Sequence, residues 1–146
     1  MNNQFEKRTG AAGYQLSNPD ALSLASLYGS LNVFSRTDMK SIRRKSSLLS
    51  AYLRLLLEKK LQKRVSFLTP SDPAASGAQL SVSFDLGNPD LFMAKVRDKG
   101  LMIDLRTGAE HYPTIFRLAP NGLYNTFMDV NEAAQIMIET FLEILQ

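Results

Sequence analysis

The sequence predicts an α+β fold in which helices cover one side of a small, mostly antiparallel sheet. Four segments repeat apolar residues at helical spacing, and four shorter segments read as strands, most clearly where apolar and polar residues alternate. The order is helix, helix, strand, strand, helix, strand, strand, helix. Because helices and strands do not alternate strictly, this order favours α+β over a parallel sheet with crossover helices.

The composition is that of an ordinary globular protein. The chain has 146 residues, 45% of them hydrophobic and 21% charged, so one domain with its own core is expected. Its formal net charge is +3, and most of the basic excess lies in residues 40–45 and 59–64. On helices such clusters usually form solvated faces, and no basic motif interleaved with aromatic residues predicts a nucleic-acid partner.

Composition also excludes several kinds of site. Without cysteine the chain has no disulfide framework, thiol nucleophile or Cys-based metal site, which fits a reducing compartment. The sole histidine, His111, falls in a predicted surface loop, so one chain offers neither a histidine-based triad nor a multi-histidine metal site. Residues 1–8 have no apolar core, and no later run approaches the length of a membrane span. The predicted location is cytoplasmic.

Residues 1–16 are predicted to be an irregular lead-in, and residues 17–146 are predicted to form the domain. The first helix would begin with Asn18 as N-cap, Pro19 at the first helical position and Asp20 near the positive end of the dipole. An apolar stripe predicts that this helix is amphipathic and docks through one face. The stripe consists of Leu24, Leu27, Leu31 and Phe34.

A second, longer helix is predicted from about residue 38 to about residue 60, after a Ser-x-x-Asp capping pattern at Ser35 to Asp38. Lysines and arginines fall on its outer face, and Ser46 occupies one position of its apolar seam. The seam consists of Met39, Ile42, Leu49, Leu53 and Leu56. Such a helix is long for a globular protein, and we expect the sheet to pack against it.

The rest of the chain predicts strands and two further helices. Asn88 and Pro89 open a helix that Gly100 ends. Thr126 is the predicted N-cap of the last helix, with Asp129 returning the bond in a capping box. That helix is expected at residues 127–145, and the strands at residues 65–68, 79–86, 101–105 and 115–119.

Arg117 is the residue that regular structure does not explain. It is a permanent cation between Phe116 and Leu118, in a predicted strand that is otherwise half buried. A buried guanidinium needs a partner, and its planar fork of donors matches a carboxylate best. Two kinds of partner stay open: the carboxylate of a ligand, or an internal acid such as Asp104 or Asp129.

The surroundings of Arg117 resemble the C-terminal signature of the kynureninase family, namely RLAP at residues 117–120 followed by LYNTFMDV at residues 123–130. Several further blocks resemble that family in the same order, and a series of ordered blocks is more specific than one short motif. These blocks are residues 10–19, 29–34, 43–46 and 77–81. The resemblance runs from about residue 5 to the end, but it covers only the last third or so of a kynureninase. The large domain with the cofactor-bearing lysine is not represented.

The resemblance implies the C-terminal small domain of a fold-type-I pyridoxal-phosphate enzyme, which is aminotransferase-like. It also implies the hydrolysis of kynurenine or 3-hydroxykynurenine to anthranilate or 3-hydroxyanthranilate and alanine, in tryptophan catabolism. Arg117 would bind the α-carboxylate of the substrate. Asn18 matches an asparagine that lines the cofactor pocket, although a plain helix cap explains it equally well.

The resemblance also marks a departure from the family. At Asn121 and Gly122 the family tends to have an apolar residue and a proline, so we expect a looser turn there. Tyr124 and Asn125 are expected to fix the turn and the start of the last helix rather than to touch the substrate. Asp104 and Arg106 resemble another family pair, which we interpret as a structural ion pair.

No catalytic residue is assigned within this chain. No lysine lies in a segment that resembles the family's lysine block. A basic helical face or its end holds several lysines as solvated amines, which are poor nucleophiles, namely Lys40, Lys45, Lys59, Lys60 and Lys63. We therefore expect the chain to be inactive alone and to pair with a large-domain or full-length kynureninase chain, as in a homodimer. Two alternatives stay open: a non-catalytic binding module or remnant that associates with a kynureninase, and a piece of a longer protein.

Overall fold

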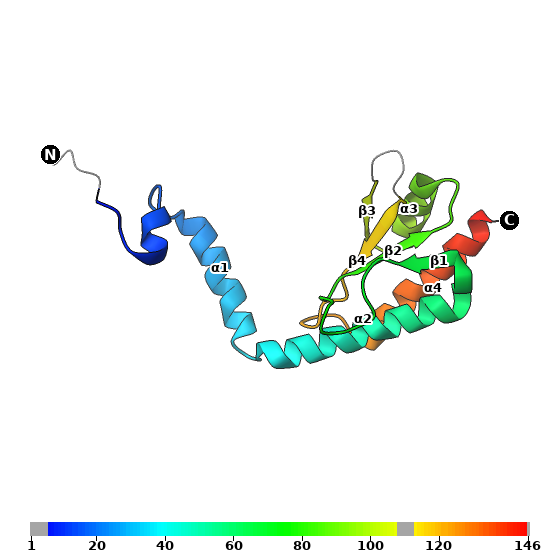
Figure 1. Cartoon of the computed structure of the whole chain (residues 1–146), viewed down its shortest axis with the longest axis horizontal. Helices are drawn as coiled ribbons and strands as arrows, with labels where there is room; N and C mark the ends of the chain where they lie inside the picture. The colour runs from blue at the N-terminus through cyan, green and yellow to red at the C-terminus, as the bar shows by residue number, and fades with distance from the viewer. Residues whose placement is uncertain (1–5, 108–112, 146) are drawn as a thin grey trace. The chain divides into compact units, whose positions relative to one another are not determined.

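The computed structural model describes residues 6–107 and 113–145, and it divides the chain into two compact units (Figure 1). The first unit ends at Asp38 and the second begins at Met39. The sequence placed the start of the domain at residue 17, so one predicted helix of that domain lies in the first unit. Its assignment to the same domain as the sheet stays a prediction.

The first unit contains a short 3₁₀ helix, η1 (Gly10–Tyr14), and the helix α1 (Ala21–Phe34). The N-cap of α1 is Asp20, whose carboxylate accepts hydrogen bonds from the backbone N–H and the hydroxyl of Ser23, both at 2.8 Å. These bonds lower the pKa of Asp20. The predicted Asn18 cap is therefore wrong, because a carboxylate two residues further on accepts two bonds at once.

The predicted docking of α1 through its stripe finds no partner among the described residues of this unit, so it stays a prediction. None of the residues of α1 is buried, including the four that form the stripe. Apolar residues outside the stripe, such as Leu22 and Val33, are equally exposed. The other described helix of this unit, η1, has no buried residue either.

The second unit contains a four-stranded antiparallel sheet with the order β1-β2-β4-β3. The strands are β1 (Val65–Phe67), β2 (Leu80–Phe84), β3 (Asp104–Arg106) and β4 (Ile115–Leu118). This confirms the predicted α+β class and the antiparallel sheet. The strand predicted at residues 101–105 forms only in part, because the N–H of Leu101 bonds the carbonyl of Val96 at 2.9 Å and closes the preceding helix.

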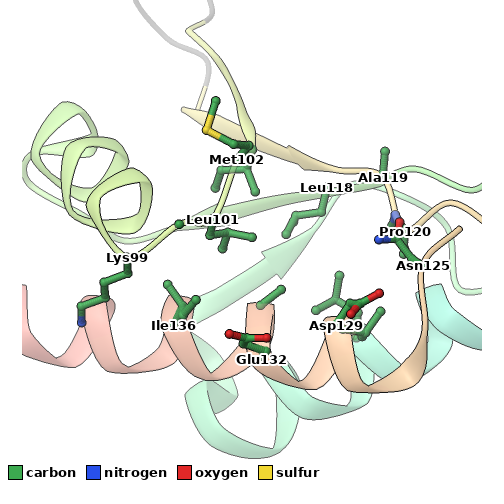
Figure 2. A pocket seen from close by; sticks show the side chains of 15 residues that line it. Lys99, Leu101, Met102, Leu118, Ala119, Pro120, Asn125, Asp129, Glu132 and Ile136 are labelled. Atoms are coloured by element: carbon green, nitrogen blue, oxygen red, sulfur yellow. The ribbon is translucent and has the colours of Figure 1, made fainter.

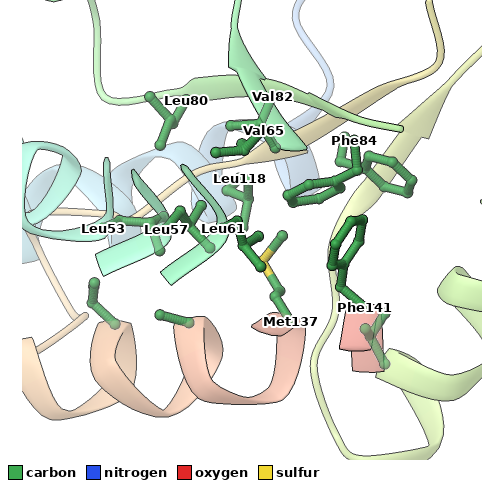
Figure 3. Close-up of a cluster of buried hydrophobic side chains, with 14 of the residues drawn as sticks. Leu53, Leu57, Leu61, Val65, Leu80, Val82, Phe84, Leu118, Met137 and Phe141 are labelled. Atoms are coloured by element: carbon green, nitrogen blue, oxygen red, sulfur yellow. The ribbon is translucent and has the colours of Figure 1, made fainter. Parts of the chain in front are cut away.

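Three helices pack against one face of this sheet, α2 (Met39–Leu61), α3 (Pro89–Asp98) and α4 (Phe127–Ile144), and a 3₁₀ turn, η2 (Gln62–Arg64), follows α2 (Figure 1). The buried residues of β2 alternate, as predicted. Phe84 and Phe116 from the sheet meet Phe92 of α3 and Phe141 of α4, with ring centroids 5.0 to 5.7 Å apart. This aromatic cluster and the leucines of α2 form one continuous core (Figure 3).

The buried side of α2 follows a strict four-residue spacing. It consists of Leu49, Leu53, Leu57 and Leu61, preceded by Ser46. The predicted seam is correct at Ser46, Leu49 and Leu53, and Leu56 packs against the core although it is only partly buried. The fully buried Leu57 was not predicted, and Met39 is 70% exposed. Because four residues turn the helix by slightly more than a full turn, this face drifts around the axis as the helix continues.

Two arginines of α2 hold the connection between β1 and β2. The guanidinium of Arg54 stacks over the ring of Phe67 at 4.3 Å and donates to the carbonyl of Thr69. Arg43 donates to the carbonyls of Pro73 and Ser76. The basic cluster at residues 40–45 is therefore not entirely a solvated face, because one of its cations satisfies backbone acceptors of this loop.

The turn after β4 fits closely against α2. The backbone N–H of Asn121 donates to Oδ1 of Asn125, and the backbone N–H of Leu123 donates to Oδ1 of Asn121, each at 2.8 Å. A Cβ at Gly122 would lie 2.5 Å from the carbonyl oxygen of Ile42 and 3.1 Å from the backbone nitrogen of Ser46. The expected loose turn is therefore wrong, because glycine allows the two backbones to touch.

Gly122→Ala is expected to lower the free energy of unfolding by about 1–3 kcal/mol, since the new methyl group must push the turn away from α2. Gly87→Ala is the matched control, because a Cβ at Gly87 meets nothing within 4 Å. Urea unfolding of both variants measures the difference. Equal stabilities would show that the close approach at Gly122 has no energetic weight.

The capping box of α4 forms as predicted. The hydroxyl of Thr126 accepts the N–H of Asp129 at 3.2 Å, and the carboxylate of Asp129 accepts the N–H of Thr126 at 2.8 Å. The bond from the backbone of Thr126 lowers the pKa of Asp129 below its usual 3.8. Its ionised form therefore stabilises the folded state above about pH 4, and this contribution is lost as the pH falls through the folded pKa.

Asp129→Asn is expected to lower the free energy of unfolding at neutral pH. The difference from wild type, called the gap below, should narrow as the pH falls below about 4. Urea unfolding at several pH values between about 7 and 3 measures the gap. Asp90→Asn, in the first turn of α3 but outside any capping box, should give a smaller gap. A gap for Asp129→Asn that stays constant over this pH range would contradict the assignment.

Candidate functional site

The candidate site lies on the face of the sheet opposite the core. Phe116 and Leu118 of β4 are buried against the helices, and successive side chains of a strand point to opposite faces. The side chain of Arg117 therefore projects from the other face, where it is 36% exposed. This places a permanent cation on a surface that α2, α3 and α4 leave uncovered.

A carboxylate opposite Arg117 fixes its guanidinium. Asp104 of β3 is the direct cross-strand neighbour of Arg117, and its Oδ2 lies 2.8 Å from Nη2 of the arginine. The other oxygen of Asp104, Oδ1, lies 2.7 Å from Nη1 of Arg106. We call these three residues the charged triplet. It confirms the predicted ion pair of Asp104 and Arg106, and it shows that Arg117 has an internal partner.

The charged triplet is not electrically balanced. Among the residues that the structure describes, two guanidinium groups face a single carboxylate, so the three side chains carry one net positive charge. Asp104 engages one nitrogen of Arg117, whose fork has five N–H donors. Its Nε is buried and makes no hydrogen bond within the described part of the chain. The net positive charge and the Nη N–H groups of Arg117 that Asp104 does not engage can bind one further anion, whereas the buried Nε is closed to solvent.

Asn18 lies in the first unit and Arg117 in the second, so the two predicted residues form no common site within either unit. Asn18 is exposed and lines a shallow polar hollow with Arg8, Gln15 and Ser17. Since Asp20 is the cap of α1, the helix-cap explanation of Asn18 fails. Its predicted role at a cofactor stays a prediction.

The chain by itself does not fit a pyridoxal-phosphate site. Such a site needs an uncharged lysine amine in a cavity, but no lysine in residues 6–107 and 113–145 is buried. Lys99 and Lys95 lie 2.6 and 3.4 Å from the carboxylate of Glu143, and their hydrogen bonds lower the pKa of that group. Ammonium groups held in this way are poor nucleophiles.

Sequence analysis missed a second concavity. A pocket of about 350 Å³ lies between residues 99–103, the end of β4 and α4. Figure 2 shows Leu101, Leu118 and Ile136 around its apolar part, with Asp129 and Glu132 on the α4 side. The signal that could have indicated it is the apolar run at residues 101–103, which does not join the sheet and so leaves a gap beside α4.

The remaining expectations concern His111, metal ions and membrane spans. His111 is outside the described residues. In the part of the chain that the structure describes, no three His, Cys, Asp or Glu side chains gather to hold a metal ion. No helix within that part has the length and apolar character needed to cross a membrane.

Comparison with known proteins gives a consistent set of relatives. Residues 42–137 match the model of the kynureninase C-terminal domain. A kynureninase of Coccidioides immitis and kynureninase 1 of Aspergillus oryzae are each 41% identical in an alignment of 145 positions that covers 95% of this chain and 29% of the relative. Kynureninase 2 of Aspergillus oryzae is 44% identical in an alignment of 133 positions that covers 89% of this chain and 27% of the relative. The chain thus spans less than a third of the length of these relatives.

Separate and combined replacement of Asp104 by Asn and Arg117 by Gln should give a coupling free energy of about 0.2–1 kcal/mol, as is usual for exposed ion pairs. Urea unfolding of the four proteins of this double-mutant cycle measures the coupling. A coupling of several kcal/mol would instead mean that Arg117 serves mainly to hold β3 on the sheet.

Proposed function

The chain belongs to the kynureninase family, and on that premise we propose that it supplies the small-domain side of a kynureninase active site. The reaction would be the hydrolysis of kynurenine or 3-hydroxykynurenine to anthranilate or 3-hydroxyanthranilate and alanine. Arg117 would bind the α-carboxylate of the substrate. The observation that carries the proposal is the net positive charge of the triplet at Arg117, which no further carboxylate balances among residues 6–107 and 113–145, within a sequence block of this family.

The contacts of Arg117 suit this role. The internal carboxylate of Asp104 approaches one nitrogen at 2.8 Å and so orients the guanidinium plane. The remaining donors can bind a planar carboxylate through two parallel hydrogen bonds, which lysine cannot reproduce. Because Arg117 lies on a strand, its backbone is held by both neighbouring strands, as accurate placement of a ligand requires.

The cofactor and the catalytic groups would come mainly from outside this chain. Pyridoxal phosphate is implied by the family, and Asn18 would contribute one contact at the cofactor. The lysine for the Schiff base, the acid for the ring nitrogen and the donors for the phosphate would belong to the large domain of a kynureninase. The assembly would be dimeric, and the chain alone would be inactive.

A second candidate function is a non-catalytic module that binds a kynureninase. The exposed apolar side chains of α1 favour it, since surfaces of this kind usually mark a site for a partner. In this case the charged triplet would have no substrate, and binding would occur without turnover.

The test is to co-express the full chain with the N-terminal part of a kynureninase relative, and to follow anthranilate release with kynurenine and pyridoxal phosphate. The chain alone should be silent and the assembly active. Arg117→Ala should lower kcat/KM about 100-fold or more, because a charged, bidentate contact is lost. Arg117→Lys should recover only part of it.

Arg64→Ala is the control, because Arg64 is an exposed arginine of the second unit outside the charged triplet. It should leave kcat/KM unchanged. Full activity of Arg117→Ala would exclude Arg117 as the carboxylate clamp. An assembly that forms but shows no turnover would favour the binding module.

A further inference from the structure

Helix α1 has the sequence character of a fully buried helix. Its fourteen residues include no charged side chain. Leu24, Leu27 and Leu31 share one side, whereas Leu22 lies about 160° around the axis from Leu24. A helix that is apolar on opposite sides is normally enclosed by other protein on more than one side. Within its own unit, all of these side chains are exposed.

The comparisons place this helix in a part of the chain that kynureninases share. The match to the C-terminal domain model begins at residue 42, after α1. The relatives from Coccidioides immitis and Aspergillus oryzae nevertheless cover 95% of the chain, which leaves too few residues outside the match to omit a helix of fourteen. In these relatives, α1 would therefore connect the C-terminal domain with the part of the protein that the match does not cover.

We infer that α1 is the element through which this chain docks to the larger, N-terminal part of a kynureninase subunit, in a groove with apolar walls on two sides. The inference rests on the proposed function and names the surface by which the two parts join. A second copy of the chain fits less well, because one further α1 helix would cover only one side of its partner. Ala21, Ala25 and Gly29, spaced four residues apart, would let one wall approach the helix backbone closely.

The test compares two leucines that are equally exposed on different helices. Leu27 of α1 is 53% exposed and Leu48 of α2 is 52% exposed. Each is replaced by Glu in the full chain, which is co-expressed with the N-terminal part of a kynureninase relative so that the two parts assemble as they fold. A glutamate that must be buried without a partner strongly disfavours docking. Leu27→Glu should therefore reduce co-purification at least tenfold, and Leu48→Glu should leave it within about twofold.

Leu22→Glu tests the opposite side of the helix and should reduce co-purification to a similar extent. Neither α1 variant should change the thermal unfolding of the second unit, whose core contains no residue of α1. This separates a loss of docking from a loss of folding. If Leu27→Glu leaves co-purification unchanged, or if Leu48→Glu weakens it equally, α1 is not the docking element.

Two further outcomes separate this inference from the proposed function. If Leu27→Glu weakens the assembly but the wild-type assembly shows no turnover, α1 is the docking element and the proposed catalytic function is excluded. If the assembly is active and Leu27→Glu does not weaken it, the proposed catalytic function is supported and the docking role of α1 is overturned. Self-association of the purified chain that Leu27→Glu abolishes, without binding to the kynureninase part, would make a second copy the occupant and overturn the inference as stated.

Discussion

The alternation of side chains along β4 is the constraint on which the candidate site depends. Phe116 and Leu118 must be buried, because Phe116 joins the aromatic cluster that ties α3 and α4 to the sheet. A strand that buries these two residues has to present Arg117 on the opposite face. Burial of the two apolar neighbours therefore sets the direction of the arginine side chain, and a shift of one residue in register would bury the cation and expose both apolar side chains.

The elements that the sequence predicted well are those with local causes. Asn88 with Pro89, and Thr126 with Asp129, satisfy backbone donors within one turn of the helix, so their effect can be read from neighbouring residues. The N-cap of α1 was misassigned because Asn18 and Asp20 are both good caps. The choice between them depends on which side chain reaches Ser23, and the sequence pattern does not contain that information.

The parts that were not predicted depend on contacts between distant segments. Gly122 was interpreted as a weak point of the turn, whereas its lack of a side chain is what lets the turn reach α2 near residue 42. For Arg117, chemistry predicted a carboxylate partner but left the choice open between a ligand, Asp104 and Asp129. The pairing of β3 with β4 selects Asp104 as the internal partner, and this register follows from the fold of the whole sheet.

The two edges of the sheet have a consequence for how the protein associates. Both edge strands, β1 and β3, are three residues long, whereas the inner strands are longer. An edge this short offers few unpaired backbone groups, so it is a poor template for adding a strand from another molecule. Growth of the sheet into ordered aggregates is thereby disfavoured. Association of this protein therefore depends on contacts between side-chain surfaces, which single substitutions can abolish.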